Sequence, residues 1–192
     1  MKSTIILCSG GARSGKSEFA EQLALSLKGR KAYVATGQAF DDEMKDRIKK
    51  HQLRRGKEWI TFEIPLHLHK NWEQIKNVSD VILIDCLTMF TSNHLFAHGD
   101  INTQEDSNRI ESIILEELRL LLQDINNSND KTVIFVTNEI GLGIVPENKL
   151  ARYFRDITGR VNREVASAAN KMYLTISGVT IELKSQEVHI NG

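Results

Sequence analysis

Eight residues near the start of the chain have the composition and spacing of a phosphate-binding loop. The segment GGARSGKS, residues 10–17, follows the apolar run TIILCS, and its glycines Gly10 and Gly15 flank four residues directly before Lys16 and Ser17. Glycines let backbone N–H groups approach phosphate oxygens, and a helix starting after the loop directs its positive N-terminus at the same anion. Lys16 would add charge at the β- and γ-phosphates, and Ser17 would bind Mg²⁺. The segment predicts a nucleoside triphosphate site, with an ordinary glycine-rich turn as the alternative.

An aspartate ends another apolar run. Asp85 closes the sequence VILID, and an acid at the tip of a buried strand completes the magnesium site of P-loop nucleotide enzymes. Taken alone, such an aspartate more often begins a turn or caps a helix. Beside a phosphate-binding loop the metal role is the better interpretation. We therefore expect Asp85 and Ser17 to share Mg²⁺.

A histidine among arginines lies in the segment DDEMKDRIKKHQLRRGKEW, residues 41–59. On a helix, Arg47, His51 and Arg55 would line one face because they are spaced four residues apart. Such a basic run is usually a solvated helix face. A neutral imidazole can also attack phosphorus while guanidinium groups neutralise the charge that develops on the phosphate. The spacing leaves both interpretations open.

The elements that must position these residues alternate between short apolar runs and longer amphipathic stretches. Strand-like runs cover residues 3–9, 31–37, 78–88, 130–139 and, as one or two closing strands, 171–184. Helical spacing covers residues 17–29, 106–127 and 150–165, the last with an apolar stripe that fits a core or a subunit interface. Strands alternating with helices predict an α/β fold with a mostly parallel sheet and helices on both faces.

Four of the strand-like runs end in small, polar or acidic residues. Ligands of open α/β sheets bind beyond the carboxyl ends of the strands, where such residues would meet. These ends are Ser9–Gly10, Thr36–Gly37, Asp85–Cys86 and Thr137–Glu139. The pattern predicts one shared polar site at this edge of the sheet.

Length, charge and cysteine spacing indicate how many domains the chain has and which partners it lacks. The chain has 192 residues, which fits one domain spanning 1–192, since domains commonly hold about 100–200 residues. Its 25 basic and 25 acidic residues leave no net charge, so we expect neither nucleic acid nor a membrane surface as a partner. Two cysteines without CxxC spacing fit reduced, buried thiols, and no leader or membrane-spanning run is evident. We expect a cytoplasmic protein.

Several motifs together resemble one enzyme family. The segments GGARSGKS, DDEM, RI..H...R and VTNE.G.GIVPEN.LAR.FRD..GRVN are similar to those of the bifunctional adenosylcobinamide kinase and adenosylcobinamide-phosphate guanylyltransferase of cobalamin biosynthesis. The resemblance runs from about residue 5 to residue 184, and its Thr137–Asn162 block is far more specific than a P-loop. It implies a RecA-like P-loop fold with an antiparallel C-terminal edge, assembled as a homotrimer.

The resemblance also implies two reactions. Adenosylcobinamide would first be phosphorylated by ATP or GTP, and GMP would then pass from GTP to that phosphate through a guanylylated histidine, His51. Lys16 would be catalytic beside it, and Ser17 and Asp85 would hold Mg²⁺. The nucleotide-binding residues implied are Gly10, Gly11, Ala12, Arg13, Ser14, Gly15, Lys16, Ser17, Ala35, Thr36, Gly37, Gln52, Leu53, Arg54, Arg55, Glu63 and Asp85. Asn138 and Glu139 could face the substrate or the metal.

Two other function classes remain possible from the residues alone. One is a monofunctional P-loop kinase of a small alcohol, in which His51 is a surface residue. The other is a non-enzymatic nucleotide-dependent switch, or a RecA-like ATPase that acts on a protein or on DNA. The chain has no basic stripe and little sequence beyond one core domain, which disfavours this second class.

Overall fold

A seven-stranded sheet forms the centre of the protein. The computed structural model describes residues 2–38, 56 and 58–189. The strand order is β3-β2-β4-β5-β1-β6-β7, with every neighbouring pair parallel except β6 and β7, which are antiparallel. The predicted parallel sheet with an antiparallel C-terminal edge is therefore confirmed. The strands are β1 (Thr4–Gly10), β2 (Lys31–Ala35), β3 (Trp59–Glu63), β4 (Val81–Asp85), β5 (Thr132–Asn138), β6 (Lys171–Ile176) and β7 (Val179–Glu182).

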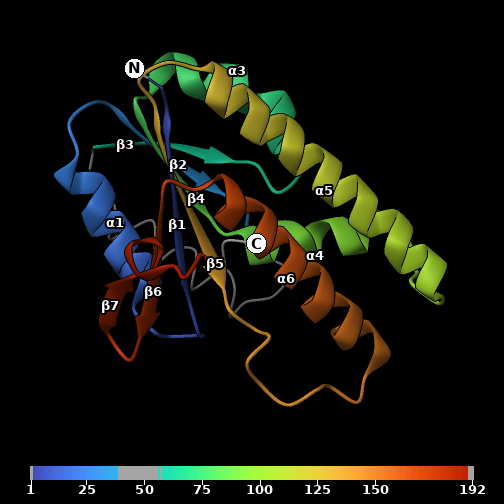
Figure 1. Ribbon diagram of the computed structural model, residues 1–192. Helices are drawn as coiled ribbons and strands as arrows, with labels where there is room; N and C mark the ends of the chain where they lie inside the picture. Colours follow the sequence, from blue (N-terminus) through green and yellow to red (C-terminus); the bar gives the residue numbers. More distant parts are fainter. Residues whose placement is uncertain (1, 39–55, 57, 190–192) are drawn as a thin grey trace.

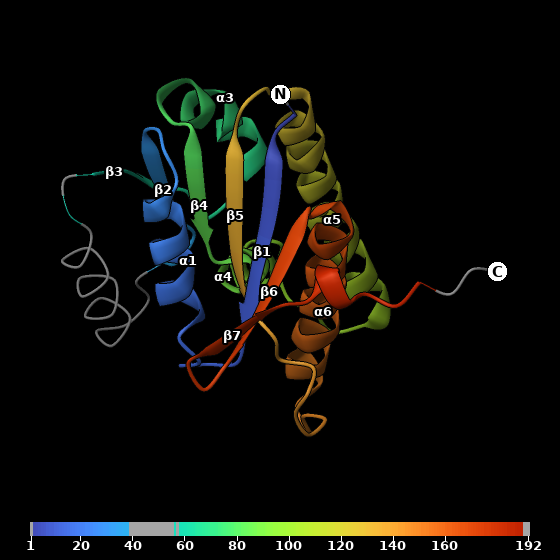
Figure 2. The same cartoon turned by 60° about the vertical axis from the view of Figure 1, so that its left-hand side comes forward.

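Helices cover both faces of this sheet (Figures 1 and 2). One face carries α1, and the other carries α3, α4, α5 and α6. A single 3₁₀ turn follows β7. The helices are α1 (Lys16–Ser26), α3 (Leu68–Val78), α4 (Leu87–Ala97), α5 (Gln104–Asn127) and α6 (Lys149–Ala168), and the 3₁₀ turn is η1 (Lys184–Gln186). In the described part of the chain, none of the helices combines the length and apolar character needed to cross a bilayer.

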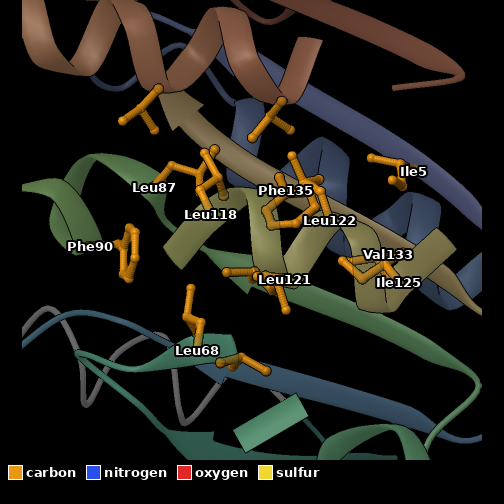
Figure 3. Packing of buried hydrophobic residues seen from close by; sticks show 14 of the residues in the cluster. Ile5, Leu68, Leu87, Phe90, Leu118, Leu121, Leu122, Ile125, Val133 and Phe135 are labelled. Atoms are coloured by element: carbon orange, nitrogen blue, oxygen red, sulfur yellow. The ribbon is translucent and has the colours of Figure 1, made fainter. Parts of the chain in front are cut away.

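The larger of two apolar cores lies between the sheet and helices α3 to α6. Figure 3 shows leucines of α5, such as Leu118 and Leu122, meeting Phe135 of β5. The apolar stripe of α6 contributes Ile157, Val161 and Val165, which are all fully buried. These three residues therefore belong to the apolar core of the chain itself, and the stripe does not by itself indicate a subunit interface.

The smaller core lies between the sheet and α1. Ala20 and Ala24 are its buried helix residues, and such small side chains let α1 approach the sheet closely. Cys8 and Cys86 belong to this core as free, buried thiols, as predicted. Burial raises the pKa of Cys8 to about 12, and burial together with the Asp85 charge raises that of Cys86 to about 11. Both thiols stay protonated at neutral pH, so a structural role fits them.

One strand and two α-helices of the described chain were not predicted from the sequence, namely β3, α3 and α4. Helix α4 has no helical alternation of apolar and polar residues because seven of its eleven residues are buried, between the sheet and helices α5 and α6. Strand β3 is an edge strand with mostly exposed side chains, so its sequence WITFE gives little strand signal. Long α5 was predicted, and it begins with a capping box between Thr103 and Asp106.

Candidate nucleotide-binding site

The loop between β1 and α1 needs glycine at two positions. Gly15, the residue before the first turn of α1, has φ of 95°, a left-handed conformation that other residues rarely adopt. A β-carbon on Gly10 would lie 2.4 Å from the carbonyl oxygen of Thr175 and 2.6 Å from Oγ of Ser14. A side chain at Gly10 would therefore force its neighbours to move, and a side chain at Gly15 would strain the left-handed backbone. The loop thus has the strand-loop-helix setting that its sequence motif requires.

Lys16 is folded back over this loop. Its side-chain Nζ donates a hydrogen bond to the carbonyl oxygen of Gly11 at 3.0 Å, and the residue is only 7% exposed. The Lys16 charge also acts on the thiol of Cys86, which places the ammonium group near the end of β4. Ser17 follows in the first turn of α1 and is partly exposed. A phosphate chain in the loop would therefore meet backbone N–H groups, one ammonium and one hydroxyl.

The four polar strand ends come together at one edge of the sheet, as the sequence predicts. Strands β2, β4, β5 and β1 are consecutive neighbours, so their ends form a continuous row. Backbone hydrogen bonds continue past the strands, from Thr36 N–H to the Asp85 carbonyl at 3.1 Å and from Glu139 N–H to the Gly10 carbonyl at 3.0 Å. The phosphate-binding loop is thereby fixed against β5, and β2 against β4.

Asp85 ends β4 in this row. Its Oδ2 accepts a hydrogen bond from the hydroxyl of Tyr33 at 2.9 Å, and its charge contributes to the raised pKa of Cys86. The carboxylate oxygens of Asp85 and the hydroxyl of Ser17 are hard oxygen ligands of the kind that Mg²⁺ prefers. The charges of Asp85 and Lys16 both act on the Cys86 thiol, so both groups lie near the end of β4. The residues present fit a magnesium ion.

Thr36 connects two strands and a helix. Its buried hydroxyl donates to the Cys86 carbonyl and accepts from the Cys86 N–H, both at 2.7 Å. Its carbonyl accepts from Nδ2 of Asn93 in α4 at 2.7 Å, and the same amide donates to the Pro65 carbonyl at 2.9 Å. Thr36 is therefore a structural clamp at the nucleotide edge. Ala35 ends β2, and the partly exposed Gly37 follows the clamp.

Among the predicted site residues that the structure describes, Glu63 lies farthest from the phosphate-binding loop. It ends β3, the edge strand, which is four strands away from β1. With neighbouring strands about 4.8 Å apart, β3 is roughly 19 Å from the strand that carries the loop. Only the far end of an extended nucleotide could reach Glu63 from the loop.

A second clamp holds the end of β5, and its helix members Thr88 and Asn162 were not predicted from the sequence. Thr88 of α4 accepts from the Asn138 N–H at 2.8 Å, and Nδ2 of Asn162 in α6 donates to the Asn138 carbonyl at 3.1 Å. The Thr137 hydroxyl donates to Oδ1 of Asn162 at 2.6 Å. Asn162 lies within the helical pattern of α6, and Tyr33 lies within the strand pattern of β2. In both cases the neighbouring residues do not indicate which distant group the polar side chain binds. The clamp fixes the backbone that presents Asn138 and Glu139.

Part of the predicted site lies outside the described residues. This part includes the proposed nucleophile and the basic residues near it, together with two predicted nucleotide contacts. They are Arg47, His51, Gln52, Leu53, Arg54 and Arg55. Their roles stay predictions.

Solved structures similar to this chain bear on its fold. Among solved structures, an ATPase from the type III secretion system of pathogenic bacteria superposes with a TM-score of 0.57 and 11% identity, covering 98% of this chain and 59% of that chain. That likeness shows the fold alone, a RecA-like P-loop fold.

Sequence relatives are much closer. The bifunctional adenosylcobalamin biosynthesis protein CobU of Escherichia coli K12 is 42% identical over 182 residues, which is 94% of this chain and 99% of that protein. CobU of Salmonella typhimurium is 43% identical with the same coverage, and CobP of Pseudomonas aeruginosa is 34% identical over 92% of this chain and 95% of that protein. Residues 6–183 match the family model. With the loop, Lys16 and Asp85 in place at the sheet edge, the chain belongs to the cobinamide kinase / cobinamide phosphate guanyltransferase family.

Proposed function

We propose that this protein phosphorylates adenosylcobinamide with ATP or GTP and then transfers GMP from GTP to the new phosphate, giving adenosylcobinamide-GDP. One observation carries the proposal: a phosphate-binding loop closed by Lys16 lies at the same sheet edge as Asp85, in a chain that matches this family over residues 6–183. The direct test is incubation with adenosylcobinamide and analysis of the corrinoid by mass spectrometry. We expect a phosphorylated product with ATP and a GDP-linked product after addition of GTP, whereas an unmodified corrinoid would refute the proposal.

In the kinase step, the substrate hydroxyl oxygen bonds to the γ-phosphorus as the bond to the β,γ-bridging oxygen breaks. The hydroxyl proton is released, and the nucleoside diphosphate leaves. Lys16 and the N–H groups of the loop would stabilise the negative charge on the transferred and leaving groups. Ser17 and Asp85 would hold Mg²⁺, which when bound supplies further positive charge at the phosphates.

In the guanylyl step, a neutral His51 imidazole would bond to the α-phosphorus of GTP, and pyrophosphate would leave. The resulting phosphorus–nitrogen bond holds GMP on the protein. An oxygen of adenosylcobinamide phosphate then bonds to the same phosphorus as the bond to His51 breaks. Two displacements with a covalent intermediate replace one direct transfer between two anions. Arg54 and Arg55 would stabilise the charge that develops on the α-phosphate.

The guanine nucleotide would extend along the strand row in this step. We propose that Gln52, Leu53 and the residues at the ends of β2 and β3, namely Ala35–Gly37 and Glu63, contact its ribose and base. The position of Glu63 supports this arrangement, because β3 lies roughly 19 Å from β1 and only the base end of GTP would reach that far.

Replacing Asp85 by asparagine should raise the magnesium requirement of both steps. A neutral amide is a weaker ligand for a hard cation than a carboxylate, so we expect the Mg²⁺ concentration for half-maximal rate to rise about tenfold. The measurement is a magnesium titration of each reaction at saturating nucleotide. Asp80→Asn is a matched control, because Asp80 lies at the opposite end of β4, where it pairs with Arg30 and Lys131. An Asp85→Asn curve that overlays the wild-type curve would assign Asp85 a purely structural role.

The assembly is proposed to be a homotrimer of single-domain subunits, residues 1–192, in the cytoplasm. Exposed apolar side chains support a subunit contact, because monomers rarely leave such groups clustered in solvent. Leu142, Ile144 and Val145 are exposed in the loop before α6, and Phe96 lines a hollow of about 380 Å³ between α4 and α6. Sedimentation equilibrium at micromolar concentration should give three times the 21.8 kDa chain mass, and a monomer mass would refute the trimer.

A further inference from the structure

The hairpin of β6 and β7 lies directly against the phosphate-binding loop. The Gly178 N–H in its turn donates to the Ser14 carbonyl at 2.8 Å, and a β-carbon on Gly15 would lie 3.6 Å from the Gly178 Cα. Both turn residues, Ser177 and Gly178, have positive φ, as a tight two-residue hairpin turn requires. Figure 2 shows this turn beside the chain that leads into α1. The hairpin is thus continuous with the surface that would hold the phosphates.

One face of this hairpin is apolar and exposed. Ile176 pairs with Val179 across the turn, and Ile181 follows on the same face, with exposures of 59%, 68% and 51%. The opposite face is occupied, because Tyr173 packs on Phe19 of α1 with ring centroids 5.0 Å apart. Covering the exposed face would contribute roughly 25 cal/mol for each Å² of apolar surface removed from water.

The strand order gives a nucleotide two directions in which to extend from the loop. In one direction lie Ala35–Gly37 and Glu63, on strands roughly 14 and 19 Å from β1. In the other direction β6 is the immediate neighbour of β1, and the Ile176–Val179 pair flanks the turn bonded to Ser14. The direction determines which phosphorus lies over the middle of the strand row. A base on the β2 and β3 side brings the α-phosphorus there, and a base on the hairpin brings the γ-phosphorus there.

We propose that the exposed face formed by Ile176 and Val179 binds the purine base of the triphosphate that donates its γ-phosphoryl group. The two reactions would then share one phosphate-binding loop and use the nucleotide in opposite orientations. The inference rests on the proposed function, which requires two phosphorus atoms to react at one site. Aliphatic side chains offer no hydrogen-bond donor or acceptor that distinguishes adenine from guanine. A base site of this kind would bind ATP and GTP alike, which fits a kinase step that accepts either nucleotide.

The test compares binding of ATP with binding of inorganic triphosphate, which has no base. In the double variant Ile176→Ser, Val179→Ser we expect ATP affinity, measured by calorimetry on the full chain, to fall about tenfold. Inorganic triphosphate affinity should stay within twofold, because the loop itself is unchanged. The KM for GTP in self-guanylylation should also stay within twofold. Leu120→Ser, which removes a partly exposed apolar side chain of α5, is the matched control and should leave ATP affinity unchanged.

Four results would overturn the inference. They are unchanged ATP affinity with unchanged sedimentation, an equal loss of triphosphate affinity, an equal rise of the GTP KM in self-guanylylation, or unchanged ATP affinity with a changed sedimentation coefficient. The second would mean that the substitutions distort the loop, and the last that this face is a subunit contact. Because calorimetry needs no corrinoid, a protein that binds ATP through the hairpin yet leaves adenosylcobinamide unmodified would refute the proposed function alone.

Discussion

Lys16→Ala lowers kcat/KM of both the kinase and the guanylyl step by an expected 10²- to 10³-fold, the usual cost of removing one group that stabilises transition-state charge. The side chain is 7% exposed and already lies over the Gly11 carbonyl in the phosphate-binding loop, so its charge is held at the place where phosphates would bind. Both reactions break a bond within the same triphosphate chain. One lysine should therefore act in each of them.

The measurement is the steady-state rate of each half-reaction with saturating adenosylcobinamide or its phosphate. Lys28→Ala is the control, because Lys28 is exposed beyond the end of α1 and should leave both rates unchanged. Loss of kinase activity with guanylylation at the wild-type rate would contradict the account. It would require a second nucleotide site that does not use this loop.

His51→Ala separates the two reactions. Removal of the nucleophile should reduce GMP transfer to adenosylcobinamide phosphate by at least about 10⁴-fold, since covalent catalysis has no substitute when its attacking group is lost. Phosphorylation of adenosylcobinamide should stay within about threefold of the wild-type rate, because that step needs no imidazole nucleophile. The assay is production of the phosphorylated and GDP-linked corrinoids by the same enzyme preparation.

His189→Ala is the matched control for this variant. His189 is exposed near the C-terminus, so its removal should affect neither reaction. Equal loss of both activities in His51→Ala would instead indicate that the residue supports the fold or the nucleotide site as a whole. Unchanged GMP transfer would mean that His51 is not the nucleophile, and would favour the alternative interpretation of its segment as a solvated basic helix face.

The sequence predicted the row of strand ends because each end has its own local signature. A buried apolar run followed by Gly10, by Thr36 or by Asp85 indicates where a parallel strand meets a ligand, and these residues do meet at one edge. The loop was recognisable for the same reason, since its glycines and Lys16 all lie in one short stretch of the sequence, residues 10–16. Contiguous motifs report local backbone geometry, which the neighbouring sequence determines.

Contacts between distant segments could not be predicted in this way. The Tyr33 hydroxyl meets Asp85 52 residues later in the chain, and Asn162 meets the Asn138 carbonyl from another helix. Such pairs depend on the order of strands and the placement of helices, which local patterns of apolar and polar residues do not reveal. Helix α4 was missed for a related reason, because burial on nearly all sides removes the periodicity by which a surface helix is recognised.

Covalent retention of GMP is the most direct test of the central claim that one loop supplies GTP to His51. The protein is incubated with GTP labelled on the α-phosphate, denatured, and divided between mild acid and alkali before peptide mapping. We expect label on the peptide that contains His51, stable in alkali and released in acid, because protonation of the nitrogen makes it a better leaving group from phosphorus. Label on a lysine, or GMP transfer without any protein-bound label, would contradict the account, the latter because the corrinoid phosphate would then attack GTP directly.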